Sequence, residues 1–238
     1  MKIALIGYGK MGQAIEEIAV AKGYEIMLRI NFNNAELLTK QNLQQADVAI
    51  EFTGAQSAVS NLRICADAGV ACICGSTGWL NEWNEVSKYF LENNGTLLYA
   101  SNFSIGVHLF FELNSFLSKL MNNYKDYDVM LAEIHHTQKK DAPSGTAITL
   151  AEQILANNPL KRRWVNNLSD NKQNLEIISE RTDPAPGTHK VKYHSAIDDI
   201  EIIHTAHSRK GFAAGALLAA EFIKDKKGIF TMKDALFL

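Results

Sequence analysis

The chain has 238 residues, of which 47% are hydrophobic and 21% are charged, and its formal net charge is -2. This composition fits an ordinary globular protein of one large or two small domains and excludes a disordered or fibrous chain. So small a net charge gives no basic field for nucleic acid, and no apolar run is long enough to span a membrane. Three cysteines are too few for a disulfide framework, and a strand follows the initial methionine without a signal peptide, so we expect a cytoplasmic protein.

The first predicted element is a strand at residues 2–6, followed by a glycine-rich turn and a helical pattern. Glycines at positions 7, 9 and 12 match the GxGxxG fingerprint in the setting of strand, turn and helix that a dinucleotide site requires. In such a loop the first glycine makes a tight turn, the second admits the pyrophosphate and the third lets helix and strand pack closely. A plain turn between a strand and a helix is the alternative interpretation. We expect cofactor contacts from Gly7, Tyr8, Gly9, Lys10, Met11 and Gly12.

The second predicted strand, at residues 24–30, ends without the acidic residue that normally holds the ribose hydroxyls of NAD. Arg29, Ile30, Asn31 and Phe32 stand at this end instead. Since no carboxylate would repel a 2′-phosphate here, we expect Asn31 to contact the cofactor and NADPH to be accepted at least as well as NADH.

Short apolar runs then alternate with amphipathic helical patterns, with strands at 47–52, 70–74 and 96–100 and helices at 57–68 and 81–93. This alternation predicts an α/β fold with a Rossmann-type, doubly wound parallel sheet. Ligands of such sheets bind at the carboxyl ends of the strands, where small and polar residues suit a flat ring, although simple turn chemistry explains each loop taken alone. The expected cofactor contacts at these ends are Phe52, Thr53, Gly75, Ser76, Thr77, Ala100, Ser101, Asn102 and Phe103.

A long apolar helix is predicted at 105–121, and after it the pattern changes to longer strands at 128–134, 175–181, 188–195 and 199–207 around one helix. This change predicts a second domain of the α+β class, with the basic run at 161–163 as a solvated loop. A helix at 213–224 is expected to return to the first domain. We therefore expect a dinucleotide-binding domain of residues 1–103 and 209–238 and a second domain of residues 104–208.

The densest chemistry lies at residues 133–146, which read Glu-Ile-His-His-Thr-Gln-Lys-Lys-Asp-Ala-Pro-Ser-Gly-Thr. An imidazole transfers protons near neutral pH, an ammonium group binds a carboxylate, and the N–H groups of a helix start beside Gly145 attract anions. The segment therefore suits an anionic substrate, although a surface histidine pair and a helix cap are the structural alternatives. We expect no metal site, because neighbours on a strand point to opposite faces and His135 and His136 would not ligate one ion.

Several stretches make the chain similar to the dihydrodipicolinate reductases: Ile-Gly-Tyr-Gly-Lys-Met-Gly at 6–12, Gly-Ser-Thr-Gly at 75–78, Ser-Asn-Phe-Ser-Ile-Gly-Val at 101–107 and the segment 133–147. Residues 208–216 resemble the closing segment of that family. The resemblance implies NAD(P)H-dependent reduction of 4-hydroxy-tetrahydrodipicolinate, a small cyclic dicarboxylate, to tetrahydrodipicolinate with loss of water, in lysine and diaminopimelate biosynthesis. It also implies that the second domain binds substrate and assembles a homotetramer.

Carried over by position, the resemblance makes His135 the general acid and Lys139 a residue that donates a proton or binds substrate. It implies that His136, Gly145 and Thr146 bind a substrate carboxylate. It also assigns Gly75 to Thr77 and Ala100 to Phe103 to cofactor contacts near the nicotinamide.

The chain departs from the family pattern at three points. Thr137-Gln138 replaces a frequent Arg-His pair, which removes positive charge and predicts weaker substrate affinity, and Asn31 replaces a frequent acidic residue. A Gly-Glu-His signature survives only as Gly-Thr-His at 187–189, and we expect His189, His194 and His204 to be structural. Two alternatives stay open, namely another two-domain NAD(P)-dependent oxidoreductase of the aspartate dehydrogenase type and a non-catalytic NAD(P)H-binding sensor.

Overall fold

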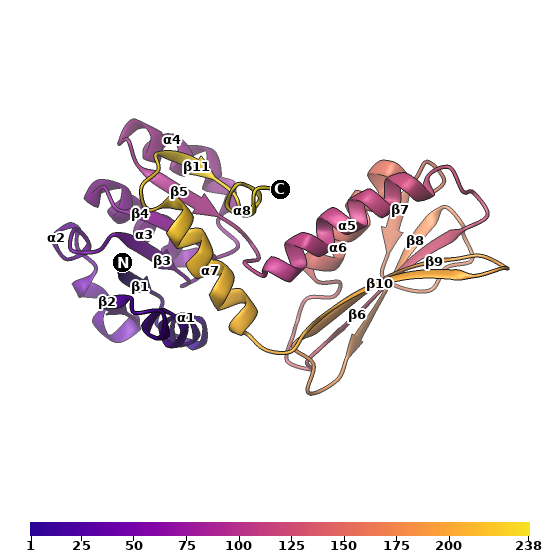
Figure 1. Cartoon of the computed structure of the whole chain (residues 1–238), viewed down its shortest axis with the longest axis horizontal. Coiled ribbons are helices and arrows are strands. Elements are labelled where there is room, and N and C mark those ends of the chain that lie inside the picture. The colour runs from indigo at the N-terminus through magenta and orange to yellow at the C-terminus, as the bar shows by residue number, and fades with distance from the viewer. The chain divides into compact units, whose positions relative to one another are not determined.

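The computed structural model describes all 238 residues, and the chain divides into two compact units, each of which is described by itself (Figure 1). Unit 1 consists of Met1–Ile105 and Arg209–Leu238, and unit 2 consists of Gly106–Ser208. Each unit is built around one sheet. None of the helices combines the length and the apolar character that crossing a lipid bilayer requires.

The sheet of unit 1 has six strands in the order β11-β5-β4-β3-β1-β2, and every neighbouring pair is parallel. The strands are β1 (Lys2–Ile6), β2 (Glu25–Ile30), β3 (Val48–Glu51), β4 (Ala71–Cys74), β5 (Thr96–Tyr99) and β11 (Gly228–Phe230). The chain moves from β1 to β2 on one side and through β3, β4 and β5 on the other, so the strand order reverses between β1 and β3. This topology confirms the predicted Rossmann-type sheet, and folds of this type bind ligands at the reversal point.

Helices pack on both faces of this sheet, because its strands bury side chains on both sides. The helices are α1 (Lys10–Ala21), α2 (Lys40–Leu43), α3 (Ala55–Ala68), α4 (Trp83–Glu92), α7 (Lys210–Ile223) and α8 (Met232–Leu236), with 3-10 turns η1 (Phe32–Leu37) and η2 (Leu80–Glu82). Ile3 and Leu5 of β1 belong to a core with α1 and α7, whereas Ala4 and Ile6 belong to a core with α3 and α4. The short elements α2, α8 and β11 were not predicted, because runs of three to five residues carry little periodicity.

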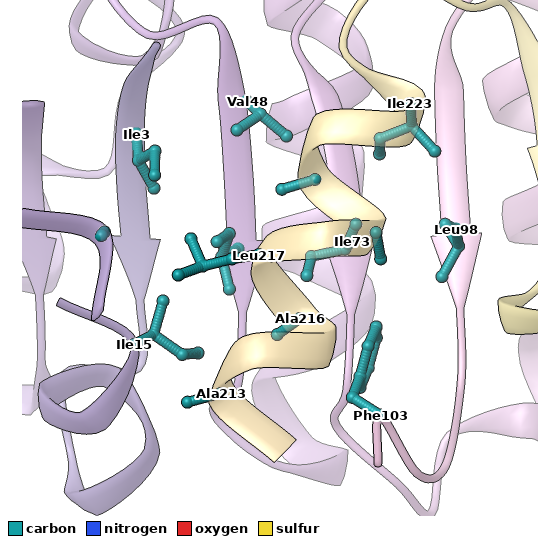
Figure 2. Close-up of a cluster of buried hydrophobic side chains, with 14 of the residues drawn as sticks. Ile3, Ile15, Val48, Ile73, Leu98, Phe103, Ala213, Ala216, Leu217 and Ile223 are labelled. Carbon is teal, nitrogen blue, oxygen red and sulfur yellow. The ribbon is translucent and has the colours of Figure 1, made fainter. Parts of the chain in front are cut away.

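Helix α7 runs along the strands of the first core with small side chains toward the sheet (Figure 2). Ala213 and Ala216 let the helix backbone approach, and Leu217 fills the space between neighbouring strands. A Cβ atom on Gly215 would lie 1.8 Å from the carbonyl oxygen of Phe103. Small residues therefore let this helix pack directly against the segment that follows β5.

The sheet of unit 2 has five strands in the order β10-β9-β6-β8-β7, with antiparallel pairs β10-β9 and β9-β6 and parallel pairs β6-β8 and β8-β7. Its elements are α5 (Ile105–Met121), β6 (Asp128–His135), α6 (Gly145–Asn157), β7 (Arg163–Val165), β8 (Asn174–Arg181), β9 (Gly187–His194) and β10 (Asp199–Ala206). Leu131, Ile177 and Val191 from three adjacent strands form one core with α5 and α6, so both helices pack on the same face. The mixed sheet confirms the predicted second, α+β domain.

One prediction for unit 2 is wrong. The basic run at 161–163, expected to be a solvated loop, contains the buried Lys161, and Arg163 begins β7. The Nζ atom of Lys161 lies 2.6 Å from Oδ1 of Asp128 and donates to the carbonyl oxygen of Asn174 at 2.8 Å. A buried ammonium group needs such partners, and they come from distant parts of the sequence that composition does not reveal.

Candidate active site

The glycine-rich loop after β1 is packed so tightly that two of its positions accept only glycine. Gly7 has φ +97°, and a Cβ atom there would lie 2.2 Å from the carbonyl oxygen of Phe52. A Cβ atom on Gly12 would lie 2.8 Å from the carbonyl oxygen of Gly7. The backbone N–H groups of Gly7 and Tyr8 both donate to the carbonyl oxygen of Ile30, at 2.9 and 2.8 Å, which joins the loop to the end of β2.

The second glycine of the loop, Gly9, lies in open space. A Cβ atom on Gly9 would meet nothing within 4 Å, and Gly9 is the N-cap residue of α1 without a side-chain capping bond. The first turn of α1 also contains no acidic residue. Its N–H groups are therefore available to an anion, and the loop fits the pyrophosphate of a dinucleotide.

The end of β2 is held by hydrogen bonds within unit 1. The side chain of Asn31 accepts from the N–H of Asn33 at 2.8 Å, and the side chain of Asn34 accepts from the N–H of Asn31 at 2.7 Å. Arg29 donates from Nε to Oε1 of Glu16 at 2.9 Å. The turn that would face a ribose is therefore rigid, and it presents amide groups instead of a carboxylate.

The carboxyl ends of β3, β4 and β5 meet at one edge, because these strands are parallel neighbours. The ring of Phe52 lies 5.5 Å from that of Phe103, centroid to centroid, and a Cβ atom on Gly75 would lie 2.1 Å from Cε1 of Phe52. Ser76 and Ala100 are buried at this edge, whereas Thr77 and Ser101 are exposed and Asn102 is half-buried.

Glu51, a buried carboxylate at the end of β3, was missed by the sequence patterns. It accepts from the N–H of Thr53 at 3.0 Å and from the Thr53 hydroxyl, and Sγ of Cys74 lies 3.2 Å away. Glu51 therefore fixes the loop that carries Thr53. Glu51 is fully buried. The signal in the sequence is a single acidic residue at the end of an otherwise apolar strand, because such a residue is rarely buried without a role.

Strand β6 carries the second group of candidate residues on its helix-covered face. Alternating burial puts Glu133 and His135 on the same side as the core residues. Pairing with β9 sets His189 opposite Glu133, and pairing with β8 sets Ser179 beside it. These side chains meet at the start of α6, where Ser144 is the N-cap residue.

Glu133 is fully buried at the centre of a hydrogen-bond network. The N–H of Ser144 donates to its two oxygens at 3.0 and 3.2 Å, and the hydroxyl of Ser179 donates to Oε1 at 2.8 Å. Nη2 of Arg181 lies 3.2 Å from the same Oε1, and Nε2 of His135 lies 3.4 Å from Oε2. Burial would raise the pKa of Glu133, but the hydrogen bonds from two histidines and two serines outweigh burial and hold that pKa well below its usual range.

His189 contacts the same carboxylate and His135. The Nε2 atoms of the two histidines are 3.3 Å apart, and Nε2 of His189 lies 3.6 Å from Oε2 of Glu133 and 3.1 Å from Oγ of Ser144. Burial lowers the pKa of His189 by more than the neighbouring carboxylate raises it. His189, expected to serve only the sheet, therefore lies in the same buried cluster as the candidate acid.

Lys139 lies in the connection between β6 and α6. Its Nζ atom is 2.8 Å from Oδ2 of Asp141. Partial burial would raise the pKa of Asp141, but the hydrogen bond from this ammonium group holds it below the usual value. Arg181 donates to the carbonyl oxygen of Asp141 at 2.5 Å and also reaches Glu133, so the lysine segment is tied to the buried cluster.

Thr137 stands where related proteins frequently carry an arginine. It fixes the connection between β6 and α6. Its hydroxyl donates to Oδ2 of Asp183 at 2.5 Å, and its N–H donates to Oδ1 at 3.3 Å. These bonds from Thr137, and then the charge of the half-buried His136, lower the pKa of Asp183. His136 thus acts on the loop between β8 and β9.

The start of α6 has free space at one position, Gly145. Oγ of Ser144 accepts from the N–H of Ala147 at 3.2 Å, while a Cβ atom on Gly145 would meet nothing within 4 Å. Thr146 follows in the same first turn, which contains no acidic residue. The geometry of this turn fits an anionic group such as a carboxylate.

The sequence patterns did not identify four residues of this cluster as partners of His135. They are Glu133, Ser144, Arg181 and His189. The spacing of Glu133 and His135, two residues apart on a strand, is the signal that puts them on one face. Their partners on β8 and β9 become visible only from the strand pairing.

The ligand atoms of Glu133, His135 and His189 also lie close enough together to share a cation. Only the adjacent pair of His135 and His136 was considered for this from the sequence. The guanidinium of Arg181 already compensates the charge of Glu133, and serine donors occupy both of its oxygens. We therefore treat the cluster as a site for protons.

Two family models match the chain. The model of the N-terminal part of dihydrodipicolinate reductase matches residues 1–103, and the model of its C-terminal part matches residues 106–236. The chain belongs to the dihydrodipicolinate reductase family.

Individual members of the dihydrodipicolinate reductase family agree with this assignment. A 4-hydroxy-tetrahydrodipicolinate reductase from Christiangramia forsetii is 46% identical over 238 residues, which cover 99% of this chain and 98% of that protein. One from Methanocaldococcus jannaschii is 38% identical over 199 residues, which cover 81% and 72%. A dipicolinate-bound dihydrodipicolinate reductase from Paenisporosarcina sp. TG-14 shares the fold, with a TM-score of 0.78 at 21% identity over 100% of this chain and 99% of that chain.

The chain therefore has the activity of the dihydrodipicolinate reductases, which is NAD(P)H-dependent reduction of 4-hydroxy-tetrahydrodipicolinate to tetrahydrodipicolinate in diaminopimelate and lysine biosynthesis. Its N-terminal domain is the NAD(P)-binding domain of the family. The resemblance expected from the sequence motifs is confirmed, and the two alternative functions are set aside.

Proposed function

We propose that His135 is the general acid of this reductase and that Lys139 assists it by donating a proton or binding substrate. The observation that carries this proposal is the contact of Nε2 of His135, at 3.4 Å, with the buried Glu133 carboxylate. A carboxylate on one ring nitrogen orients an imidazole and leaves the other nitrogen for the substrate. Gly187 supports this role, because it has no side chain at the point where a Cβ atom would lie 3.2 Å from Nδ1 of His135.

The substrate would be held by the turn at the start of α6. His136, Gly145 and Thr146 would bind a carboxylate of the cyclic dicarboxylate, since no acidic residue lies in the first turn of the helix and a Cβ atom on Gly145 would meet nothing within 4 Å. Lys139 can exchange its partner Asp141 for a second carboxylate, because both are oxygen anions. The dipicolinate carried by the Paenisporosarcina enzyme is a dicarboxylate of this kind.

Residues 1–103 and 209–238 would form the cofactor-binding domain, and residues 104–208 the domain for substrate binding and oligomerisation. When bound, NAD(P)H supplies the hydride. The glycine loop with Tyr8, Lys10 and Met11 would hold the pyrophosphate. The residues at the carboxyl ends of β3, β4 and β5, including Phe52, Gly75 and Phe103, would lie beside the nicotinamide. Asn31 presents an amide in place of an acid, which supports NADPH being accepted at least as well as NADH.

The proton balance assigns a task to His135. Conversion of substrate to product takes up one hydride and one proton and releases one water molecule. The proton has to come from a group that is protonated near neutral pH and re-protonated by solvent afterwards, and an imidazole satisfies both conditions. The hydrogen bonds that lower the pKa of Glu133 favour its ionised form, which would stabilise a protonated ring.

NADPH oxidation coupled to the freshly formed condensation product of pyruvate and aspartate semialdehyde tests these roles. His135→Gln should lower kcat by about 10²- to 10⁴-fold, the usual contribution of a general acid. Lys139→Ala should lower kcat/KM, whereas the surface change Lys125→Ala should alter neither. A kcat of His135→Gln equal to that of the wild type would show that His135 is not the general acid.

The uncovered face and edge of the unit 2 sheet support a homotetramer. Both helices of the unit pack on one face, while edge strand β10 exposes Ile203 at 56% and the turn before it exposes Ile197 at 92%. Exposed apolar side chains on a sheet edge invite burial against another copy. Sedimentation at micromolar concentration should therefore give four times the chain mass, and a monomer would contradict this assembly.

A further inference from the structure

Strand β9 holds the ring of His135 from two sides. His189 approaches Nε2 of His135 to 3.3 Å. Two residues earlier on the same face of β9, a Cβ atom on Gly187 would lie 2.9 Å from Cε1 of His135, so a larger residue there would press on the ring. The N–H of Thr182 fixes the backbone of the same residue by donating to the carbonyl oxygen of His135 at 2.8 Å.

The charges around the two rings oppose a second positive charge in the pair. Two imidazolium groups with nitrogen atoms 3.3 Å apart would repel each other beside a single carboxylate. His189 is the more buried ring, and burial lowers its pKa. The other charged or titratable groups facing the pair are Glu133 of β6, Arg181 of β8, Lys139 with Asp141 before α6, and His204 of β10.

We propose that His189 is a positioning residue for the reaction, holding the ring of His135 on the Glu133 carboxylate and leaving the catalytic proton to His135. This inference rests on the proposed role of His135. Without His189, only Glu133 would remain beside Nε2 of His135, so the ring would be less firmly fixed. A displacement of about 1 Å is enough to cost about 100-fold in rate. His189 thus acts through His135 and not on the substrate.

A double-mutant cycle with His135→Gln tests this inference. His189→Leu should lower kcat by about 10- to 100-fold with the KM values for substrate and NADPH within about twofold of wild type, because binding groups are untouched. His189→Gln carries an amide near the position of Nε2 and should recover most of the loss. In the His135→Gln background His189→Leu should have almost no further effect, because its target is already gone.

His194→Leu on the same strand is the matched control, since its side chain is exposed, and it should keep wild-type kcat. Melting temperatures of all variants separate misfolding from loss of positioning, and His189→Gln remains informative where His189→Leu does not fold. An equal loss from His189→Leu with and without His135 would show that His189 only supports the fold, and this would overturn the inference. Wild-type activity of His135→Gln would instead contradict the proposed function, which separates the two failures.

Discussion

The glycine loop of unit 1 and the Glu133 cluster of unit 2 are built in opposite ways. The loop works through side chains that are missing, since a Cβ atom on Gly7 or Gly12 would strike backbone and one on Gly9 would fill the open space at the start of α1. The cluster works through side chains that are present, since Glu133 draws four hydrogen-bonding residues and one guanidinium around it. Adding atoms should therefore break the first site, whereas removing atoms should break the second.

The two sites also differ in how they respond to pH. Backbone N–H groups do not titrate, so the affinity of the loop for a pyrophosphate should be flat across neutral pH. The cluster contains a carboxylate, Glu133, and a histidine, His189, whose pKa values the surroundings lower, so its stability depends on pH. The following changes test this contrast, beginning with the largest expected effect.

Glu133→Gln should have the largest effect on unit 2. The substitution keeps the shape but removes the charge that faces Arg181 and the two histidines, and an uncompensated buried partner costs about 3 kcal/mol. Chemical denaturation should show this loss of unfolding free energy. Glu180→Gln, an exposed change on β8, should stay within about 0.5 kcal/mol of wild type. A Glu133→Gln protein as stable as wild type would mean that the carboxylate is not the centre of the cluster.

Gly7→Ala and Gly9→Ala separate folding from binding in unit 1. At Gly7 the new Cβ atom would strike the Phe52 carbonyl in a backbone conformation that alanine disfavours, and we expect about 2 kcal/mol of lost stability. At Gly9 the new atom meets no protein atom, so stability should hold while NADPH affinity falls about tenfold. Melting temperatures and fluorescence titration measure the two effects. Unchanged NADPH affinity in Gly9→Ala would exclude this loop as the pyrophosphate site.

The same contrast explains which features could be predicted from the sequence. The glycine loop lies within six consecutive residues between a strand and a helix, so its pattern and its geometry coincide. The predicted helix at 105–121 matches α5 residue for residue, because its long apolar run has no competing pattern. Features formed by neighbouring residues in the sequence can therefore be predicted without a structure.

The Glu133 cluster could be predicted only in part. His135 and Lys139 stand in a distinctive segment, but His189 lies 54 residues beyond His135 and meets it only through the pairing of β6 with β9. The prediction that Lys161 is solvated was wrong for the same reason, since its partners Asp128 and Asn174 are distant in sequence. Charged residues reveal their burial only when their partners are known.

Mild acid should destabilise the cluster. Burial lowers the pKa of His189 and of His204 below the value of 6.5 for an unperturbed histidine. The unfolded chain therefore binds these protons at a higher pH than the folded chain, so the stability they contribute is present above pH 6.5 and is lost as pH falls below it. Melting temperatures between pH 7.5 and about 5.5 should fall less steeply in His189→Gln than in wild type. Parallel curves would show that His189 does not take part in this loss.

Asn31→Asp should have the smallest effect. It tests whether an added charge at the end of β2 changes the choice of nucleotide. An aspartate keeps the oxygen that accepts from the N–H of Asn33 at 2.8 Å, so the turn at the end of β2 should persist. The added negative charge would repel a 2′-phosphate by about 1 kcal/mol near the surface, so KM for NADPH should rise several-fold while KM for NADH stays constant or falls. Ionic strength supplies the control, because screening in 1 M salt should bring the two KM values back together. An equal rise for both nucleotides at every salt concentration would instead indicate a damaged turn, and Asn31 would then have no part in choosing between them.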